Sequence, residues 1–157
     1  MPRITPNLWF DTQGEEAARF YVSVFPNSRI TAVTHYGEGG PREAGTVMTV
    51  TFVLDGQECI AINGGTQFTF DEAISLLINC ADQDEIDHYW ETLSEGGEEG
   101  PCGWLKDRYG LSWQVVPEGW ADLVNDPDQG RAQRAMHAVF AMKKIDVAAV
   151  YAAADRT

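Results

Sequence analysis

Apolar and polar residues alternate along several short stretches of the chain, and a period of two predicts β-strands. The stretches with this pattern are residues 4–11, 45–54 and 111–116. Further strands are predicted by a β-branched run at 29–36, an apolar run at 59–63, a strongly apolar run at 74–80 and a short segment at 103–105. Between two of them, Asp55-Gly56 is the dipeptide typical of a two-residue hairpin turn. The pattern therefore predicts a protein in which strands supply much of the core.

Two other stretches repeat apolar residues at helical spacing, which predicts amphipathic helices. The apolar stripes are Ala17, Phe20, Tyr21 and Val24 in the first helix, and Ile86, Tyr89, Trp90 and Leu93 in the second. A capping box precedes each stripe, Thr12 with Glu15 and Asp82 with Glu85. We expect the first helix to run to about Val24, and the second to end before Gly96.

The order strand, helix, strand, strand, strand occurs twice, and the second copy begins about 70 residues after the first. An internal duplication explains this economically, with a first module at about 3–66 and a second at about 72–118. A helical tail follows at about 119–157. In the tail, Asp126-Pro127 predicts the start of a helix that reaches about Met142, and Asp146 predicts the cap of a short last helix.

Composition narrows the class of protein. The chain has 157 residues, 44% of them hydrophobic, which suits a single compact domain over 1–157. Its formal net charge of −13 argues against binding nucleic acid or an anionic membrane surface, because both need clustered positive charge. The three cysteines are widely spaced and form no Cys-x-x-Cys pair, which indicates reduced thiols. With no leader-like segment and no long apolar run, a cytoplasmic protein is expected.

The segment from Lys106 to Pro117 carries the clearest family signal. A turn containing Asp107 and Gly110 leads into a strand in which Ser112, Gln114 and Val116 share one face. The segment resembles the closing strand of the glyoxalase/bleomycin-resistance/dioxygenase superfamily, the vicinal oxygen chelate proteins. In that superfamily the position of Gln114 holds a glutamate that binds a metal.

Further motifs extend the likeness to the PhnB-like group of that superfamily, often labelled 3-demethylubiquinone-9 3-methyltransferase-like. They are Ile4-Thr5-Pro6, Trp9-Phe10-Asp11, Phe25-Pro26-Asn27-Ser28, Tyr36-Gly37, Ala61-Ile62-Asn63-Gly64-Gly65 and Cys102 to Gly110. The resemblance implies an α+β fold, in which two βαβββ modules form a curved mixed sheet around a cavity, with helices at the C-terminus. It also implies a homodimer.

In the family, side chains from the first and last strands of each module converge in the cavity. The matching candidates for ligand binding here are Thr5, Asn7, Trp9, Asn63 (or Ala61), Ser75, Asn79, Trp104 and Gln114. None of the polar members is a good ligand for a transition metal, since such sites need imidazole, carboxylate or thiolate. We therefore expect a cavity that hydrogen-bonds a small polar or aromatic molecule, with no cofactor and without the usual divalent metal.

Two alternatives stay open. In the first alternative the protein is a metal-dependent lyase, isomerase or dioxygenase. It would recruit the metal through residues that are not among the cavity candidates, such as His35 or Glu58. It is a scaffold if its interior is filled and the buried amides are satisfied by backbone. The serines lack a nucleophile-elbow context, and the glycine-rich turns form no nucleotide fingerprint, so neither a serine hydrolase nor a methyltransferase is supported.

Overall fold

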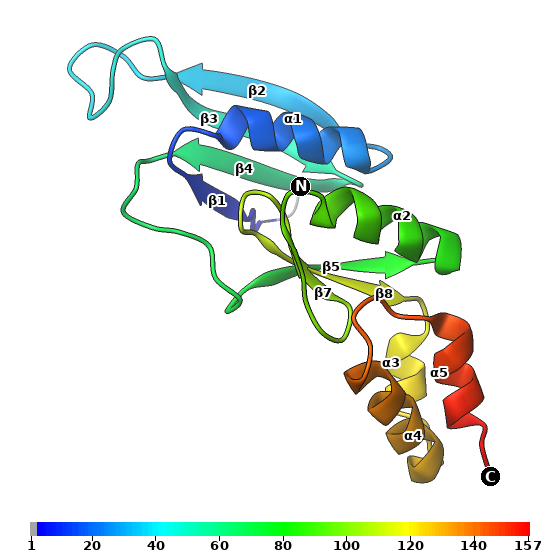
Figure 1. Ribbon diagram of the computed structural model, residues 1–157. Coiled ribbons are helices and arrows are strands. Elements are labelled where there is room, and N and C mark those ends of the chain that lie inside the picture. The colour runs from blue at the N-terminus through cyan, green and yellow to red at the C-terminus, as the bar shows by residue number, and fades with distance from the viewer. Residues whose placement is uncertain (1–2) are drawn as a thin grey trace. The chain divides into compact units, whose positions relative to one another are not determined.

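The structure is a computed structural model that describes residues 3–157 (Figure 1). The chain divides into two compact units, unit 1 at residues 1–70 and unit 2 at residues 71–157. Each unit has its own four-stranded sheet. No helix within residues 3–157 is both long enough and apolar enough to cross a bilayer.

Unit 1 is one complete strand–helix–strand–strand–strand module. Its elements are β1 (Asn7–Phe10), α1 (Gly14–Val24), β2 (Arg29–His35), β3 (Val47–Leu54) and β4 (Gln57–Asn63). The sheet order is β1-β4-β3-β2, with β1 parallel to β4 and the other neighbours antiparallel. Helix α1 lies across one face of this sheet (Figure 1).

The core of unit 1 lies between α1 and the sheet. Val50 and Phe52 of β3 are fully buried, and the Phe52 ring stacks on Tyr21 of α1 with 6.4 Å between ring centroids. The intervening residues of β3 are half-buried on the opposite face. Burial of each large apolar side chain stabilises the fold by roughly 1.5–3 kcal/mol. The helix therefore packs on the face of the sheet where alternation places the large apolar side chains.

The predicted hairpin turn is confirmed. Leu54 pairs with Gln57 across the turn, and the two residues between them have positive φ, 45° at Asp55 and 85° at Gly56. Two central residues with positive φ define the type I′ turn, whose twist matches that of the strands it joins.

Unit 2 repeats the module and then adds a tail. Its module consists of β5 (Ser75–Cys80), α2 (Gln83–Ser94), β6 (Glu98–Glu99), β7 (Trp104–Lys106) and β8 (Ser112–Pro117). The sheet order β5-β8-β7-β6, with β5 parallel to β8, is the same as in unit 1. The predicted α+β fold of two βαβββ modules is thus confirmed. The short strand β6 carried no pattern, because two residues are too few for one.

The two helix starts differ from each other. At α2 the cap is as predicted: Glu85 N donates to Asp82 Oδ1 at 2.9 Å, and Ala81 N donates to Glu85 Oε2 at 2.8 Å. At α1 the predicted capping box at Thr12 is wrong, since the N-cap residue is Gln13 and its side chain makes no capping bond.

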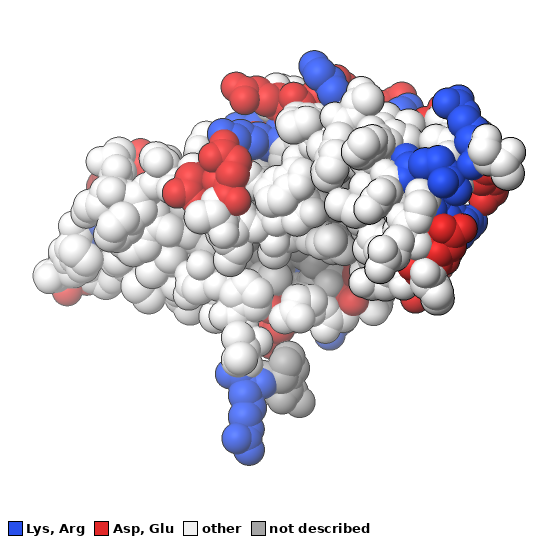
Figure 2. All heavy atoms as spheres, turned by 90° about the horizontal axis from the view of Figure 1, so that it is seen from below, with Lys and Arg blue, Asp and Glu red and all other residues white. Residues whose placement is uncertain are grey.

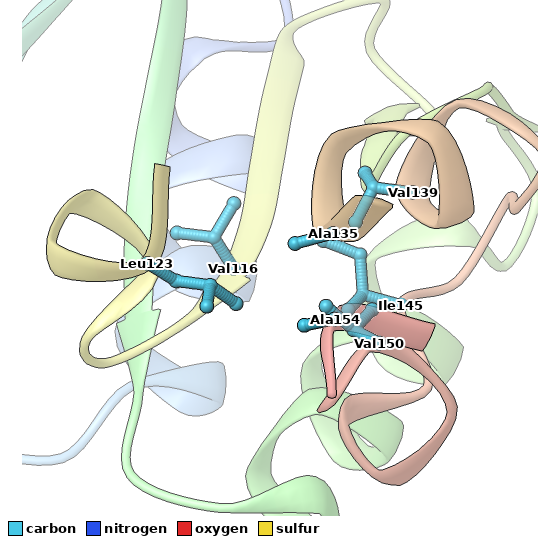
Figure 3. Packing of buried hydrophobic residues seen from close by; sticks show 7 residues of the cluster. All are labelled: Val116, Leu123, Ala135, Val139, Ile145, Val150 and Ala154. Atoms are coloured by element: carbon cyan, nitrogen blue, oxygen red, sulfur yellow. The ribbon is translucent and has the colours of Figure 1, made fainter. Parts of the chain in front are cut away.

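The tail folds into three helices, α3 (Trp120–Val124), α4 (Gln129–Phe140) and α5 (Val147–Ala154). They enclose a small apolar cluster that includes the end of β8 (Figure 3). Its members are Val116, Leu123, Ala135, Val139, Ile145, Val150 and Ala154. Helix α3 was not predicted.

Two of the three expected positions in the tail helices need correction. Helix α4 is capped by Asp128, which accepts from Arg131 N at 3.1 Å, and not by Asp126. It ends at Phe140, two residues before Met142. Helix α5 is capped by Asp146 as predicted, through Ala149 N at 3.0 Å.

Charged side chains of both signs lie together on the surface in Figure 2. On the face shown there, most Lys and Arg side chains lie beside Asp or Glu, with wide uncharged areas between the groups. This face therefore offers no continuous basic track of the kind that follows a phosphate backbone.

Candidate functional site

Polar side chains gather on the face of the unit 2 sheet opposite α2, which we call the polar face. The strand register sets them in three rows across β5, β8 and β7. The rows are Ser75, Ser112 and Lys106, continued on β6 by Glu98, then Leu77, Gln114 and Trp104, then Asn79 and Val116. Four predicted site residues, Ser75, Asn79, Trp104 and Gln114, thus share one face, as their alternation required.

Gln114 lies at the centre of the polar face and is half-buried. Its Nε2 donates to Ser75 Oγ on the neighbouring strand at 2.9 Å. Trp104, also half-buried, is its register partner on the other side. A hydroxyl that accepts one hydrogen bond still has a proton to donate, and a carboxamide still has its oxygen to accept. The pair can therefore offer both a donor and an acceptor to a polar ligand beside an aromatic wall.

Ser112 is a further polar residue of this face that sequence reasoning did not select as a site residue. It is fully buried, and its Oγ has no hydrogen-bond partner within the described part of the chain. An unsatisfied buried hydroxyl costs about 1–3 kcal/mol, so its position calls for an explanation. The alternation had already placed it on the same face as Gln114, and that signal could have identified it.

The tail closes one end of the polar face. Val116, in the third row, is 5% exposed because it packs into the tail cluster (Figure 3). The tail is held there by backbone bonds from Cys102 N to Met142 O and from Gly103 N to Lys143 O, both 2.8 Å. Asn79, the register partner of Val116, stays exposed at the edge strand.

In unit 1 the face of the sheet opposite α1 carries Trp9, and we call it the Trp9 face. Asn7 and Trp9 project from it, while Leu8 and Phe10 are buried beneath α1. The Trp9 indole donates from Nε1 to Gly65 O at 3.0 Å, and its ring meets Phe68 edge-on with 5.0 Å between centroids. Thr5 lies just before this strand and is half-buried.

Asn63 does not join this face, and its predicted orientation is wrong. Its side chain points to the helix side, where Oδ1 accepts from Gly14 N at 2.7 Å and Nδ2 donates to Val47 O at 3.2 Å. The physical reason is the parity of β4: Ala61 and Asn63 are buried on the same side, and Ile62 lies on the other. The alternative candidate, Ala61, is on the helix side as well.

A hollow of about 590 Å³ lies at the start of α1 in unit 1. Its lining combines charged, hydroxyl and small residues: Thr12, Glu15, Arg42, Glu43, Gly45, Thr46, Val47 and Asn63. The Asn63 carboxamide is already bound to Gly14 and Val47. The polar lining that remains consists of ionic groups of both signs and the hydroxyls of Thr12 and Thr46. This hollow belongs to unit 1 and is not the inter-module cavity expected from the sequence.

The residues present do not fit a divalent metal of the family kind. Around Gln114 the polar face offers hydroxyls and carboxamides, which bring too little charge to hold such an ion, and its carboxylates, Glu72 and Glu98, lie beside the Lys106 ammonium. Among residues 3–157, no three His, Cys, Asp or Glu side chains come together as a metal site. His35 and Glu58 pair with Val47 and Val53 at opposite ends of β3, roughly 20 Å apart at about 3.3 Å per residue.

The buried thiols are poor nucleophiles. Burial raises the pKa of Cys59 to about 11 and that of Cys80 to about 12, with nearby carboxylates adding to both shifts. A thiol attacks as the thiolate, and both groups stay protonated at neutral pH. All three cysteines are free.

Two βαβββ modules of this topology define the glyoxalase, or vicinal oxygen chelate, fold. Solved structures of that class match the chain. A fosfomycin resistance protein, FosX, from Listeria monocytogenes has 12% identity and a TM-score of 0.51, over 74% of this chain and 93% of its own, a likeness of fold alone. A protein from Pseudomonas aeruginosa has 21% identity and a TM-score of 0.62, over 75% and 98%.

Within this class, the chain belongs to the 3-demethylubiquinone-9 3-methyltransferase family, whose sequence model matches residues 2–116. A PhnB protein from Bacillus cereus is 38% identical, with a TM-score of 0.66, over 74% of this chain and 99% of its own. No functionally curated protein is significantly similar in sequence. The three tail helices lie beyond the range that the family model matches.

Proposed function

We propose that this protein binds a small polar or aromatic molecule on the polar face of unit 2, without a bound metal. The observation that carries the proposal is the cross-strand bond between Gln114 and Ser75 beside Trp104. Where the superfamily places a charged metal ligand, this chain holds a neutral group that both donates and accepts. Binding pockets for small molecules combine apolar walls with a few such polar groups.

The homodimer implied by the resemblance is also kept as a proposal. The monomer has a mass of 17.4 kDa, so light scattering after gel filtration tests the dimer directly. The methyltransferase activity in the family's name is not part of this proposal. The connection from β1 to α1 is the short Asp11–Gln13 segment and has no glycine-rich loop for a nucleotide-like methyl donor.

Ligand-detected NMR with a set of neutral aromatic amides tests the binding function. We expect Gln114→Leu to weaken binding about tenfold, because it removes both hydrogen-bonding groups while keeping the size of the side chain. Gln133→Leu on the exposed surface of α4 is the matched control and should leave binding unchanged. Binding that is equal in both variants would contradict the proposal.

Metal analysis of the purified protein separates this function from the enzymatic alternative. We expect no divalent ion in stoichiometric amount, because Gln114 and Ser75 carry no charge and the carboxylates Glu72 and Glu98 both lie beside the Lys106 ammonium. A stoichiometric ion that is lost in Gln114→Leu would instead support a metal-dependent lyase, isomerase or dioxygenase.

A further inference from the structure

The first row of the polar face differs from the other two because it contains charged residues, Lys106 and its register partner Glu98. Lys106 is the register partner of Ser112, which in turn pairs with Ser75. The Lys106 ammonium forms an ion pair with Glu72, which lies just before β5. A lysine on this face is not part of the neutral lining that the sequence predicted.

The ion pair crosses the middle strand of the three. Lys106 is on β7, and Glu72 precedes β5, so β8 lies between the two backbones. Neighbouring strands are about 4.8 Å apart, so the two side chains bridge roughly 10 Å at the start of β8. Ser112 is the first residue of that strand. The Lys106–Glu72 ion pair therefore lies near Ser112 Oγ, which is buried and has no hydrogen-bond partner within the described residues.

The ion pair between Lys106 and Glu72 is exposed enough for another anion to replace Glu72. The side chains of Lys106 and Glu72 are 37% and 58% exposed, and ion pairs of that kind contribute little to folding. Hydrogen bonding to Glu72 raises the pKa of Lys106, so the ammonium keeps its proton at neutral pH. Two further carboxylates, Glu98 on the neighbouring strand and Asp71, also act on this ammonium. A second anion can therefore replace Glu72 at small cost, and it meets a positive charge that these two carboxylates partly offset.

We propose that the ligand of the polar face carries a carboxylate that displaces Glu72 from Lys106 and accepts a hydrogen bond from Ser112. This inference rests on the proposed function and adds the ligand's chemical class. The carboxylate takes up the charge of Lys106 and the unused donor of Ser112. The rest of the ligand lies along the second row, against Trp104 and the Gln114–Ser75 pair. The planar anion suits one ammonium beside hydroxyl donors, whereas a doubly charged phosphate would need more positive charge.

The probes are acetate, benzoate and phenylacetate, each compared with its neutral amide and with inorganic phosphate. Binding is followed by amide chemical shifts of labelled full-length protein. We expect the carboxylates to bind more tightly than their amides, and Lys106→Met to weaken them about tenfold while leaving the amides unchanged. Glu72→Gln should strengthen carboxylate binding several-fold, because it removes the competing anion.

Lys144→Met is the matched control, since Lys144 forms a similar exposed ion pair with Asp87, at 2.8 Å, away from the polar face. It should not change carboxylate binding. Ser112→Ala should weaken the carboxylates and leave the stability of the free protein unchanged or higher, because an unsatisfied buried hydroxyl is removed. A drop in stability together with unchanged binding would assign Ser112 a packing role and overturn its part in the inference.

The outcomes separate the two proposals. In one outcome, amide binding depends on Gln114, but carboxylate binding is absent or does not depend on Lys106. This outcome overturns the carboxylate inference and leaves the proposed function standing. Phosphate binding tighter than all three carboxylates also overturns the inference. If neither amides nor carboxylates respond to Gln114→Leu or Lys106→Met, both proposals fail.

Discussion

Asn63 and Gln114 are both carboxamides in the strand that closes their unit, yet the two side chains do opposite things. Asn63 points to the helix side and binds the first turn of α1. Gln114 points to the other side of its sheet and binds Ser75. The parity of each strand sets the side to which its carboxamide points, and the helix starts of the two units differ as well. Helix α2 has its own cap, Asp82, whereas α1 has no side-chain cap and takes an acceptor from a strand.

The comparison shows that the same kind of side chain can complete a helix start in one unit and join two strands in the other. An uncapped and buried helix start leaves amide groups that must find acceptors. In unit 1 that acceptor comes from a residue 49 positions away in sequence. In unit 2 the cap is local, so the strand residues are left to build the polar face.

The largest expected effect comes from Asn63→Ala. The substitution leaves the buried Gly14 amide and Val47 carbonyl without their partner, so we expect a loss of about 2–4 kcal/mol in the free energy of unfolding. Gln114→Ala should cost about 1 kcal/mol or less, because the side chain is half-exposed. Urea unfolding at an unchanged m-value measures both. Equal losses would contradict the contrast between the two carboxamides.

Thiol labelling locates that effect. Cys59 and Cys80 are buried in different units, with pKa values raised to about 11 and about 12, so each reacts only when its unit opens. Asn63→Ala should speed the labelling of Cys59 and leave that of Cys80 unchanged.

Gly14→Ala is expected to have the next largest effect. A Cβ at this position would lie 2.7 Å from Asn63 Oδ1 and 3.3 Å from the Ala61 methyl group. Overpacking of this kind costs about 1–3 kcal/mol. Gly37→Ala is the control, because nothing lies within 4 Å of its Cβ position. In the Asn63→Ala background the cost of Gly14→Ala should shrink, and an unchanged cost would mean that the contact is not the cause.

Asp82→Ala tests the local cap of α2. We expect a loss of about 1 kcal/mol, as is usual when an N-cap carboxylate is removed. Thr12→Ala, which removes the hydroxyl of the wrongly predicted cap, should leave the stability of unit 1 nearly unchanged. Circular dichroism during urea unfolding measures both. A comparable loss of unfolding free energy in Thr12→Ala would show that the Thr12 hydroxyl does cap α1.

The smallest effect concerns the tail of unit 2. Hydrogen bonding from Arg131, 2.6 Å away, holds the pKa of Asp126 below its ordinary value. A carboxyl group with a lowered pKa in the folded state stabilises the fold above its unfolded pKa of about 3.9. That contribution is lost as the pH falls through the lower folded value. We expect Asp126→Asn to flatten the fall in melting temperature below about pH 4. An unchanged acid profile would contradict this.

Periodicity in the sequence predicted most of the fold. The apolar stripes of α1 and α2, the hairpin at Asp55-Gly56 and the caps at Asp82 and Asp146 all depend on residues close together in the chain. Local sequence therefore carried the information. The same holds for one face of the candidate site, since alternation placed Ser75 and Gln114 on the polar face.

The sequence could not predict interactions between distant residues. The parity of β4 depends on its register with β1, and the bond from Asn63 to Gly14 depends on how closely α1 approaches the sheet. Likewise, nothing local marks Glu72 as the partner of Lys106. The predicted cavity shared by the two modules stays a prediction.

By itself the sequence determined most of the elements, the duplication and the neutral side chain at the centre of the polar face, Gln114. Those features follow from residue type and short spacing. Tertiary structure decided which carboxamide caps a helix and which lies on the polar face, and it set a charged bridge near the buried Ser112. The reason is that strand register and helix packing minimise unsatisfied buried groups over the whole unit, and no short stretch of sequence contains that balance.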